Sequence, residues 1–122
     1  MAVTKHEYEN GVSYSLGDET VLEAQYESED GKLVIKIKGA VKTLVAPCFD
    51  EIIKQAMERG EQFSIDFSHV TYIASAGLRV LLNMQQDIDD RGEPIVTIIN
   101  IADAVKEVFE QTGFMNILNV AD

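Results

Sequence analysis

Hydrophobic and polar side chains alternate along this chain with two different periods. Residues 33–38 and 63–68 alternate with a period of two, which predicts strands with one buried face. Elsewhere, apolar residues recur every three to four positions, which predicts amphipathic helices. The predicted helices cover residues 46–59, 76–91 and 101–112.

Two further segments extend the pattern. Residues 95–99 are almost wholly apolar, as expected of a buried central strand, and residues 116–120 are predicted as a short last strand. Asn100 or Asp103 is expected to cap the third helix, and Gly113 to end it. Because strands alternate with helices over short loops, the strands are expected to be largely parallel.

The first 32 residues differ from the rest, because they contain eight acidic residues against two lysines. The pairs Asn10-Gly11 and Asp30-Gly31 are turn signals. The second turn predicts a hairpin, and residues 1–20 are expected to form either a further strand pair or a loose arm. The chain as a whole is therefore predicted to be one α/β domain with a mixed sheet. Residues 33–122 would form its main part, and residues 1–32 an acidic β extension of the same domain.

Charge and composition exclude several classes of function. Among 122 residues, 21 acids face 10 bases, so the net charge is −11. Such a surface repels nucleic acid and anionic membranes and favours a basic partner. No apolar run reaches the roughly 18 residues of a membrane span, and no secretory signal is visible at the N-terminus. We therefore expect no nucleic acid partner, no membrane insertion, and either a cytoplasmic location or a chain from which a signal has been removed.

The sequence also gives little support for a metal site or for redox chemistry. The single Cys48 cannot form an internal disulfide, and no Cys/His cluster has zinc spacing. Cys48 is expected to be a small packed residue, and His69 a loop histidine without a partner. Three aspartates near the end of the second helix form either a divalent-ion site or a solvated acidic face, and the second is expected. They are Asp87, Asp89 and Asp90.

The segment before the second helix is the candidate for chemistry. A strand is predicted to end near Ser68, and Ser75 lies just before the helix among the small residues Ala74, Ala76 and Gly77. Function in parallel sheets gathers where strands lead into helix N-termini, whose free N–H groups favour a phosphate. A phosphoserine would add about −1.5 to −2 charges there. From spacing alone, Ser75 is either a helix N-cap or a regulated phosphoacceptor.

Residues 70–82, VTYIASAGLRVLL, resemble the signature segment of STAS domains in the bacterial anti-sigma factor antagonist family. The likeness includes residues 65–68 and 104–114, and extends over residues 33–120. The resemblance implies a STAS fold and a non-enzymatic switch without a cofactor. In that switch an anti-sigma factor of the serine kinase type phosphorylates the signature serine, which is Ser75 here. The unphosphorylated antagonist binds the anti-sigma factor, and a PP2C-type phosphatase reverses the modification.

The chain departs from the family pattern at two places. The family often has Asp immediately before the serine, where this chain has Ala74, and Gly-Glu-Leu-Asp where residues 39–42 read Gly-Ala-Val-Lys. An adjacent acid could orient the hydroxyl or help to hold the kinase's metal, so phosphorylation would be slower, need another kinase or not occur. Lys42 would then pair with a phosphate or an acid of the partner, or be a solvated surface lysine. The alternative function is a phosphorylation-independent STAS scaffold or a regulatory domain of an anion transporter or lipid-transport complex.

The expected contact surface combines the loop after the first core strand, the signature turn and the outward side of the second helix. Its predicted residues are Lys42, Thr43, Ala74, Ser75, Ala76, Gly77, Arg79, Asn83 and Gln86.

Two other classes were weighed against this interaction module. An enzyme is disfavoured because the chain has no Gly-x-Ser-x-Gly elbow, no P-loop and no glycine-rich dinucleotide motif. A phospho-receiver domain would need aspartates at its strand ends, where this chain has Lys38-Gly39 and Phe67-Ser68.

Overall fold

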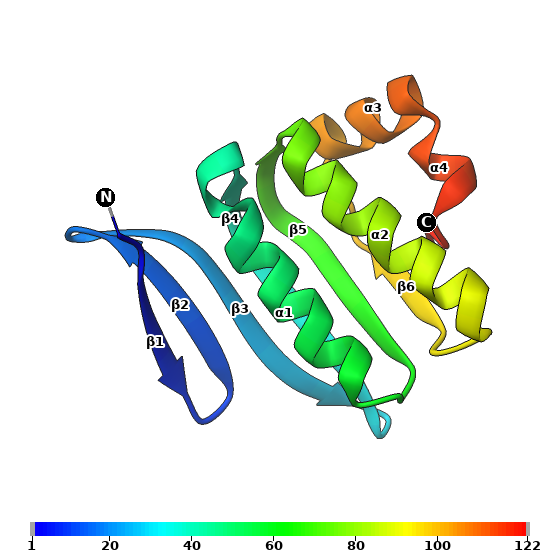
Figure 1. Ribbon diagram of the computed structural model, residues 1–122, viewed down its shortest axis with the longest axis horizontal. Helices are drawn as coiled ribbons and strands as arrows, with labels where there is room; N and C mark the ends of the chain where they lie inside the picture. The colour runs from blue at the N-terminus through cyan, green and yellow to red at the C-terminus, as the bar shows by residue number, and fades with distance from the viewer. Residues whose placement is uncertain (1, 122) are drawn as a thin grey trace.

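A six-stranded mixed sheet is the framework of the computed structural model, which describes residues 2–121. Its strands lie in sequence order from one edge to the other (Figure 1). They are β1 (Thr4–Tyr8), β2 (Gly11–Leu16), β3 (Glu19–Glu29), β4 (Lys32–Val41), β5 (Phe63–Ile73) and β6 (Val96–Ile99). The helices are α1 (Ala46–Glu58), α2 (Ser75–Arg91), α3 (Asp103–Thr112) and α4 (Phe114–Ile117), with a 3-10 turn, η1 (Thr43–Val45), before α1.

The sheet divides into an antiparallel half and a parallel half. Strands β1 to β4 pair antiparallel, whereas β4, β5 and β6 pair parallel. The prediction of a mixed sheet is therefore confirmed, and so is the expectation that the strands alternating with helices are largely parallel. Helical crossovers occur only after β4 and β5, and hairpins connect the strands before them.

The N-terminal residues form a strand pair rather than a loose arm. The turn between β3 and β4 has Asp30 at φ 53° and Gly31 at φ 78°, the left-handed pair that a two-residue hairpin requires. β1 is also tied to the helical layer, because the Lys5 ammonium contacts the Glu51 carboxylate of α1 and lies 3.0 Å from that of Glu7. The acidic extension is thus continuous with the sheet.

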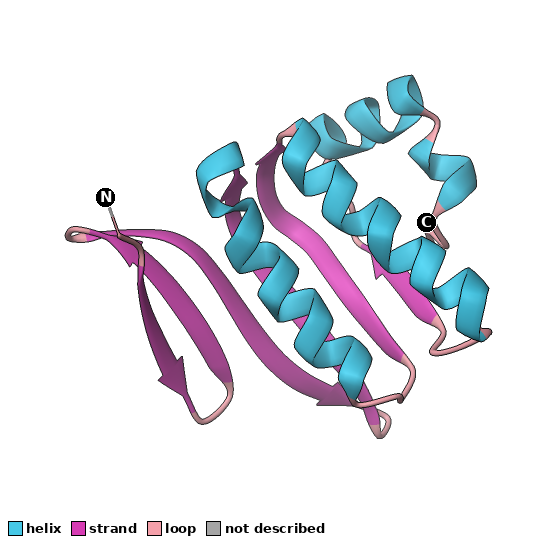
Figure 2. Cartoon of the chain, viewed as in Figure 1, coloured by secondary structure: helices cyan, strands magenta, loops and turns pink. Residues whose placement is uncertain are grey.

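The hydrophobic core lies between the sheet and the helices. α1 and α2 lie side by side across one face of the sheet (Figures 1 and 2). The apolar stripes predicted from helical spacing point into this layer, and α3 adds Phe109, whose ring centroid is 6.2 Å from that of Phe67 on β5. Fully buried side chains of the core include Ile35, Phe49, Ile52, Ile65, Phe67, Leu81 and Phe109.

The C-terminal part of the sheet differs from the predicted pattern. β6 is the last strand of the sheet rather than a central one, and Ile95, just before it, is 58% exposed. The predicted strand over residues 116–120 is instead the short helix α4, followed by a single parallel bridge between Val120 and Ile98. That bridge covers part of the β6 edge, so an apolar strand can lie there.

Element ends also need correction at two places. β5 continues to Ile73, so His69 lies in a strand and not in a loop. The N-cap of α3 is Ala102, without a side-chain capping bond, rather than Asn100 or Asp103. Gly92 and Gly113 end α2 and α3 in the left-handed conformation, as predicted. Within residues 2–121, no helix has both the length and the apolar character needed to cross a bilayer.

Candidate functional site

Strand register brings the two predicted contact loops together at the carboxyl edge of the parallel strands. Val41 on β4 lies opposite Ile73 on β5, and the Ala74 N–H donates a hydrogen bond to the Val41 carbonyl at 2.8 Å. Immediately beyond this pair, β4 leads into η1 at Lys42 and β5 leads into α2 at Ser75. The two segments that the sequence placed 33 positions apart therefore leave the sheet side by side.

The small residues of the signature turn fit α2 against the sheet. Gly77 is buried, and a Cβ atom there would lie 2.8 Å from the Cγ1 atoms of both Val41 and Ile73. Ala74 is also buried. Ala74 and Gly77 were predicted as contact residues; both are buried and shape the turn, and their contact with a partner stays a prediction.

Ser75 is the first residue of α2, and its side chain is uncommitted. Ala74 occupies the N-cap position in an extended conformation, and no side chain caps the helix. The N–H groups of Gly77 and Leu78 bond to the Ala74 carbonyl, whereas those of Ser75 and Ala76 precede the first helical bonds and have no acceptor in the helix. The interpretation of Ser75 as an N-cap is therefore wrong. Its hydroxyl is exposed, and within residues 2–121 it has no hydrogen-bond partner.

Two cations flank Ser75. Lys42 and Arg79 are both exposed, and neither forms an ion pair with any residue that the structure describes. Arg79 follows Ser75 by four positions on α2, which places both on the same side of the helix. The surroundings of Ser75 are thus locally positive in a chain of net charge −11.

A hollow of about 290 Å³ lies beside Ser75 between the first turns of α1 and α2. Predicted residues that line it are Thr43, Ala76, Arg79 and Asn83. Gln86 lies farther along α2, where it lines a separate hollow of about 520 Å³ between the two helices. The predicted surface is therefore continuous at its Ser75 end, and Gln86 is its most distant member.

Four residues at this edge of the sheet were not predicted from the sequence. Pro47 and Asp50 of α1 line the same hollow, and the segments that lead into the two helices carry two exposed large apolar side chains: Leu44 of η1, 54% exposed, and Tyr72 of β5, 52% exposed. Helical spacing put Pro47 and Asp50 off the buried stripe of α1, but nothing in the sequence indicated that they face α2. We use "Ser75 edge" for the surface made by Lys42, Thr43, Leu44, Tyr72, Ser75, Ala76 and Arg79.

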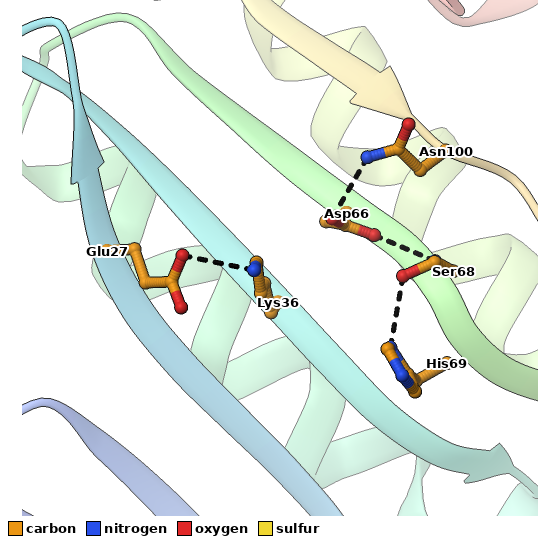
Figure 3. Close-up of polar contacts among 6 residues, drawn as sticks. All are labelled: Glu27, Lys36, Asp66, Ser68, His69 and Asn100. Carbon is orange, nitrogen blue, oxygen red and sulfur yellow. Dashed lines mark hydrogen bonds and ion pairs between the residues drawn. The ribbon is translucent and has the colours of Figure 1, made fainter.

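Another polar side chain, that of Asp66 on β5, accepts hydrogen bonds within the fold. Asp66 is only 6% exposed and lies on the face of the sheet that α1 leaves open (Figure 3). Its carboxylate accepts the Ser68 N–H at 2.8 Å and the Asn100 side-chain amide at 3.0 Å. Burial alone would raise the pKa of Asp66, but these hydrogen bonds and the nearby Lys36 charge outweigh it and lower the pKa.

The Asp66 contacts support an irregularity of the sheet. The register between β4 and β5 shifts directly after Asp66, where Ser68 and His69 follow and the Ser68 hydroxyl lies 3.0 Å from His69 Nδ1. Asn100 has φ 54° and sits after β6, so its side chain links the end of β6 to Asp66 within β5. Because every Asp66 contact is made within the fold, we assign this group a structural role.

Two of the aspartates considered as a divalent-ion site contact side chains of their own helix. Asp87 forms an ion pair with Arg91 at 3.2 Å, and Asp89 accepts a hydrogen bond from Gln85 at 3.0 Å. Across the described part of the chain, no three His, Cys, Asp or Glu side chains are placed to hold a metal ion. Cys48 is half-buried, and burial raises the pKa of its thiol.

Comparison with known proteins identifies relatives of this chain. A family model described as "Mlab, STAS domain" matches residues 24–119. The protein called "Putative anti-sigma factor antagonist BtrV" from Bordetella bronchiseptica is 32% identical over 95 residues, which is 76% of this chain and 80% of that protein. The matched region includes all of the parallel strands and the Ser75 edge.

Solved structures share the fold at lower identity. An anti-sigma factor antagonist from Mycobacterium paratuberculosis superposes with a TM-score of 0.70 at 19% identity, over 81% of this chain and 84% of that one. Unphosphorylated SpoIIAA gives a TM-score of 0.62 at 18% identity, over 81% and 88%. The phosphorylated form of Bacillus SpoIIAA gives 0.57 at 17% identity, over 81% and 91%.

Proposed function

This chain belongs to the STAS domain family, in its group of anti-sigma factor antagonists, and from that membership we propose a partner switch controlled at Ser75. The unphosphorylated chain binds an anti-sigma factor of the serine kinase type through the Ser75 edge and so frees a sigma factor. Phosphorylation of Ser75 releases the anti-sigma factor. The chain acts by contact and not as an enzyme, in the cytoplasm, with residues 33–122 as the STAS domain and residues 1–32 as its acidic extension.

One observation carries the proposal: Ser75 is exposed at the start of α2, and its hydroxyl forms no hydrogen bond with residues 2–121. A kinase needs an accessible hydroxyl, and a serine committed to capping would have to give up its bond first. SpoIIAA, which shares the fold, has been solved in phosphorylated and unphosphorylated forms. The resemblance of residues 70–82 to the signature segment implies that Ser75 is the residue that takes the phosphate.

The modification itself is a transfer of one phosphoryl group. The γ-phosphorus of ATP forms a bond to Ser75 Oγ, its bond to the β–γ bridging oxygen breaks, ADP leaves, and the hydroxyl proton passes to the kinase or to water. A PP2C-type phosphatase hydrolyses the phosphoserine and restores the hydroxyl. This chain presents the hydroxyl, and the helix N-terminus tolerates the added negative charge.

Release follows from the cost of burying that charge. Around Ser75 the surface is made of small and apolar side chains, so a partner can approach closely. A phosphate enclosed by such a contact would lose its hydration, and the nearby cations would offset that cost only in part. The phosphorylated chain should therefore keep its fold and lose its partner.

The test uses the kinase-type anti-sigma factor encoded nearest to the gene for this chain. The two proteins are incubated with ATP and magnesium and analysed by intact mass, with Ser75→Ala and the control Ser68→Ala, an exposed serine on β5, the strand that leads into α2. Wild type and Ser68→Ala should each gain one phosphoryl group, and Ser75→Ala none. In a binding measurement, Ser75→Glu should weaken affinity by about tenfold or more, and Ser75→Ala should bind like wild type.

One observation favours a second function, a phosphorylation-independent scaffold or a transporter-associated domain. Ala74 precedes Ser75 and Lys42 lies beside it, so neither adjacent position supplies a carboxylate to orient the hydroxyl. If wild type takes up no phosphate and Ser75→Glu binds unchanged, the switch is refuted and the scaffold remains.

A further inference from the structure

The charge at the Ser75 edge is opposite to that of the chain as a whole. Lys42, directly after β4, and Arg79, one helical turn after Ser75, are both exposed, and neither has an ion-pair partner among residues 2–121. The single carboxylate that lines the adjacent hollow belongs to Asp50, and it is paired with Lys54 at 2.9 Å. Two uncompensated positive charges therefore lie at the proposed contact surface.

The same edge has the apolar features of an interface. Leu44 and Tyr72 are more than half exposed, and small apolar side chains line much of the hollow between α1 and α2. They are Ala46, Pro47, Ala76 and Val80. Interfaces combine an apolar centre that excludes water with charged groups at the rim that select the partner.

We propose that the partner surface facing the Ser75 edge is acidic and inserts an apolar side chain into the hollow beside Ala76, with Lys42 and Arg79 as the specificity-determining residues. The inference rests on the proposed function only in taking the Ser75 edge as the contact surface. It reverses the expectation from composition, which favoured a basic partner. At physiological salt, charges act over roughly 8–10 Å, so the local cations outweigh the distant acids at the point of contact.

This arrangement also explains how one phosphate can switch the contact. Lys42 and Arg79 supply two positive charges, and a phosphate on Ser75 supplies about −1.5 to −2. Phosphorylation would thus cancel the local charge that attracts an acidic partner. Release then has an electrostatic cause in addition to the cost of burying the phosphate.

The first test compares two charge-reversed variants against the same kinase-type anti-sigma factor. Lys42→Glu with Arg79→Glu changes the Ser75 edge, and Lys32→Glu with Arg59→Glu is the matched control. Lys32 and Arg59 are also exposed and lie at the opposite ends of β4 and α1. Both variants make the chain more acidic by the same amount.

The expected result is a loss of affinity of about tenfold or more for the Ser75-edge variant and a change within about twofold for the control. A partner attracted by the overall negative charge would instead bind both variants more tightly. That outcome, or an unchanged affinity of the Ser75-edge variant, would overturn the inference.

A second test needs no anti-sigma factor, so it decides the inference even if the proposed function fails. Amide shifts of the ¹⁵N-labelled chain are followed with the peptide Glu-Asp-Leu-Leu-Asp-Glu and with the same peptide carrying lysine at every acidic position. The acidic peptide should shift Thr43, Ala76 and Arg79, and Lys42→Glu with Arg79→Glu should abolish those shifts while the control keeps them. Larger shifts at this edge with the lysine peptide, or none with either peptide, would refute the proposed surface.

Discussion

Asp66 and Ser75 lie nine positions apart along the same strand and its exit, yet their side chains are in opposite situations. Asp66 is buried, and the Ser68 N–H of the same strand and the Asn100 amide after β6 donate hydrogen bonds to its carboxylate. Ser75 is exposed, and its hydroxyl bonds to nothing in the described chain. A polar group whose bonds are all made within the fold stabilises that fold, whereas an uncommitted group at a shaped edge is available to a partner.

α2 shows the same division between its two sides. Leu81 is completely buried against the sheet, whereas Arg79, two positions away, is exposed and has no ion-pair partner among residues 2–121. Substitutions on the buried side should therefore change stability, and those on the exposed side should change binding. The predictions below test this division in order of decreasing effect.

The largest effect on stability is expected at Leu81. Leu81→Ala should lower the free energy of unfolding by about 2–5 kcal/mol, because it removes a large side chain and leaves a cavity. Arg79→Ala is the control and should cost less than about 0.5 kcal/mol. Urea denaturation of both variants measures the difference, and similar midpoints would show that the two sides of α2 are wrongly assigned.

Asp66→Ala should have the next largest effect and lower the free energy of unfolding by about 1–3 kcal/mol. The substitution leaves the Ser68 N–H and the Asn100 amide without their acceptor. Asp89→Ala, which removes an exposed carboxylate bonded to Gln85, should cost less than about 0.5 kcal/mol. Equal costs at the two positions would remove the structural role assigned to Asp66.

Acid should remove the contribution of Asp66 to stability only below its ordinary pKa, because the folded pKa of this carboxylate is lowered. Its folded pKa lies below the ordinary value of 3.8, so the ionised carboxylate stabilises the fold above that pH and stops doing so as the pH falls through the folded pKa. The stability difference between wild type and Asp66→Asn should therefore be constant near neutral pH and narrow below about pH 3.8. Urea midpoints measured across the acid range test this, and a difference that widens with acid would mean that the sign is wrong.

The smallest effect on stability is expected at Ser75. A helix N-cap loses about 1 kcal/mol on substitution by alanine, but Ser75 makes no capping bond. Ser75→Ala and Ser75→Glu should each change the free energy of unfolding by less than about 0.5 kcal/mol, although Ser75→Glu should weaken partner binding. Thermal and urea denaturation of the two variants check this, and a loss near 1 kcal/mol for Ser75→Ala would indicate a capping role in solution.

The sequence by itself determined the features that depend on neighbours along the chain. The period of apolar residues located α1, α2 and α3 to within two residues, because one buried stripe is enough to specify an amphipathic helix. Asp30-Gly31 specified its hairpin because only a left-handed pair closes so short a turn. The signature segment likewise located the serine at the start of α2.

Tertiary structure decided what depends on segments far apart in the chain. The short apolar strand β6 could have been central or at the edge, and only its pairing with β5 and the bridge from Val120 places it. Asn100 was predicted as a helix cap, but its amide reaches Asp66, which lies 34 positions earlier. Neither contact has a local signal, because strand pairing is set by how all of the elements pack together.

The start of α2 depends on both the local sequence and the tertiary structure. The sequence placed a serine and small residues before a helix, but the close contact of Gly77 with Val41 and Ile73 fixes where the helix rests on the sheet. That contact leaves Ala74 as the N-cap and Ser75 exposed, with Lys42 and Pro47 brought to the same edge from another part of the chain. The local sequence determines which residue types are present, whereas packing between elements determines their exposure and their neighbours.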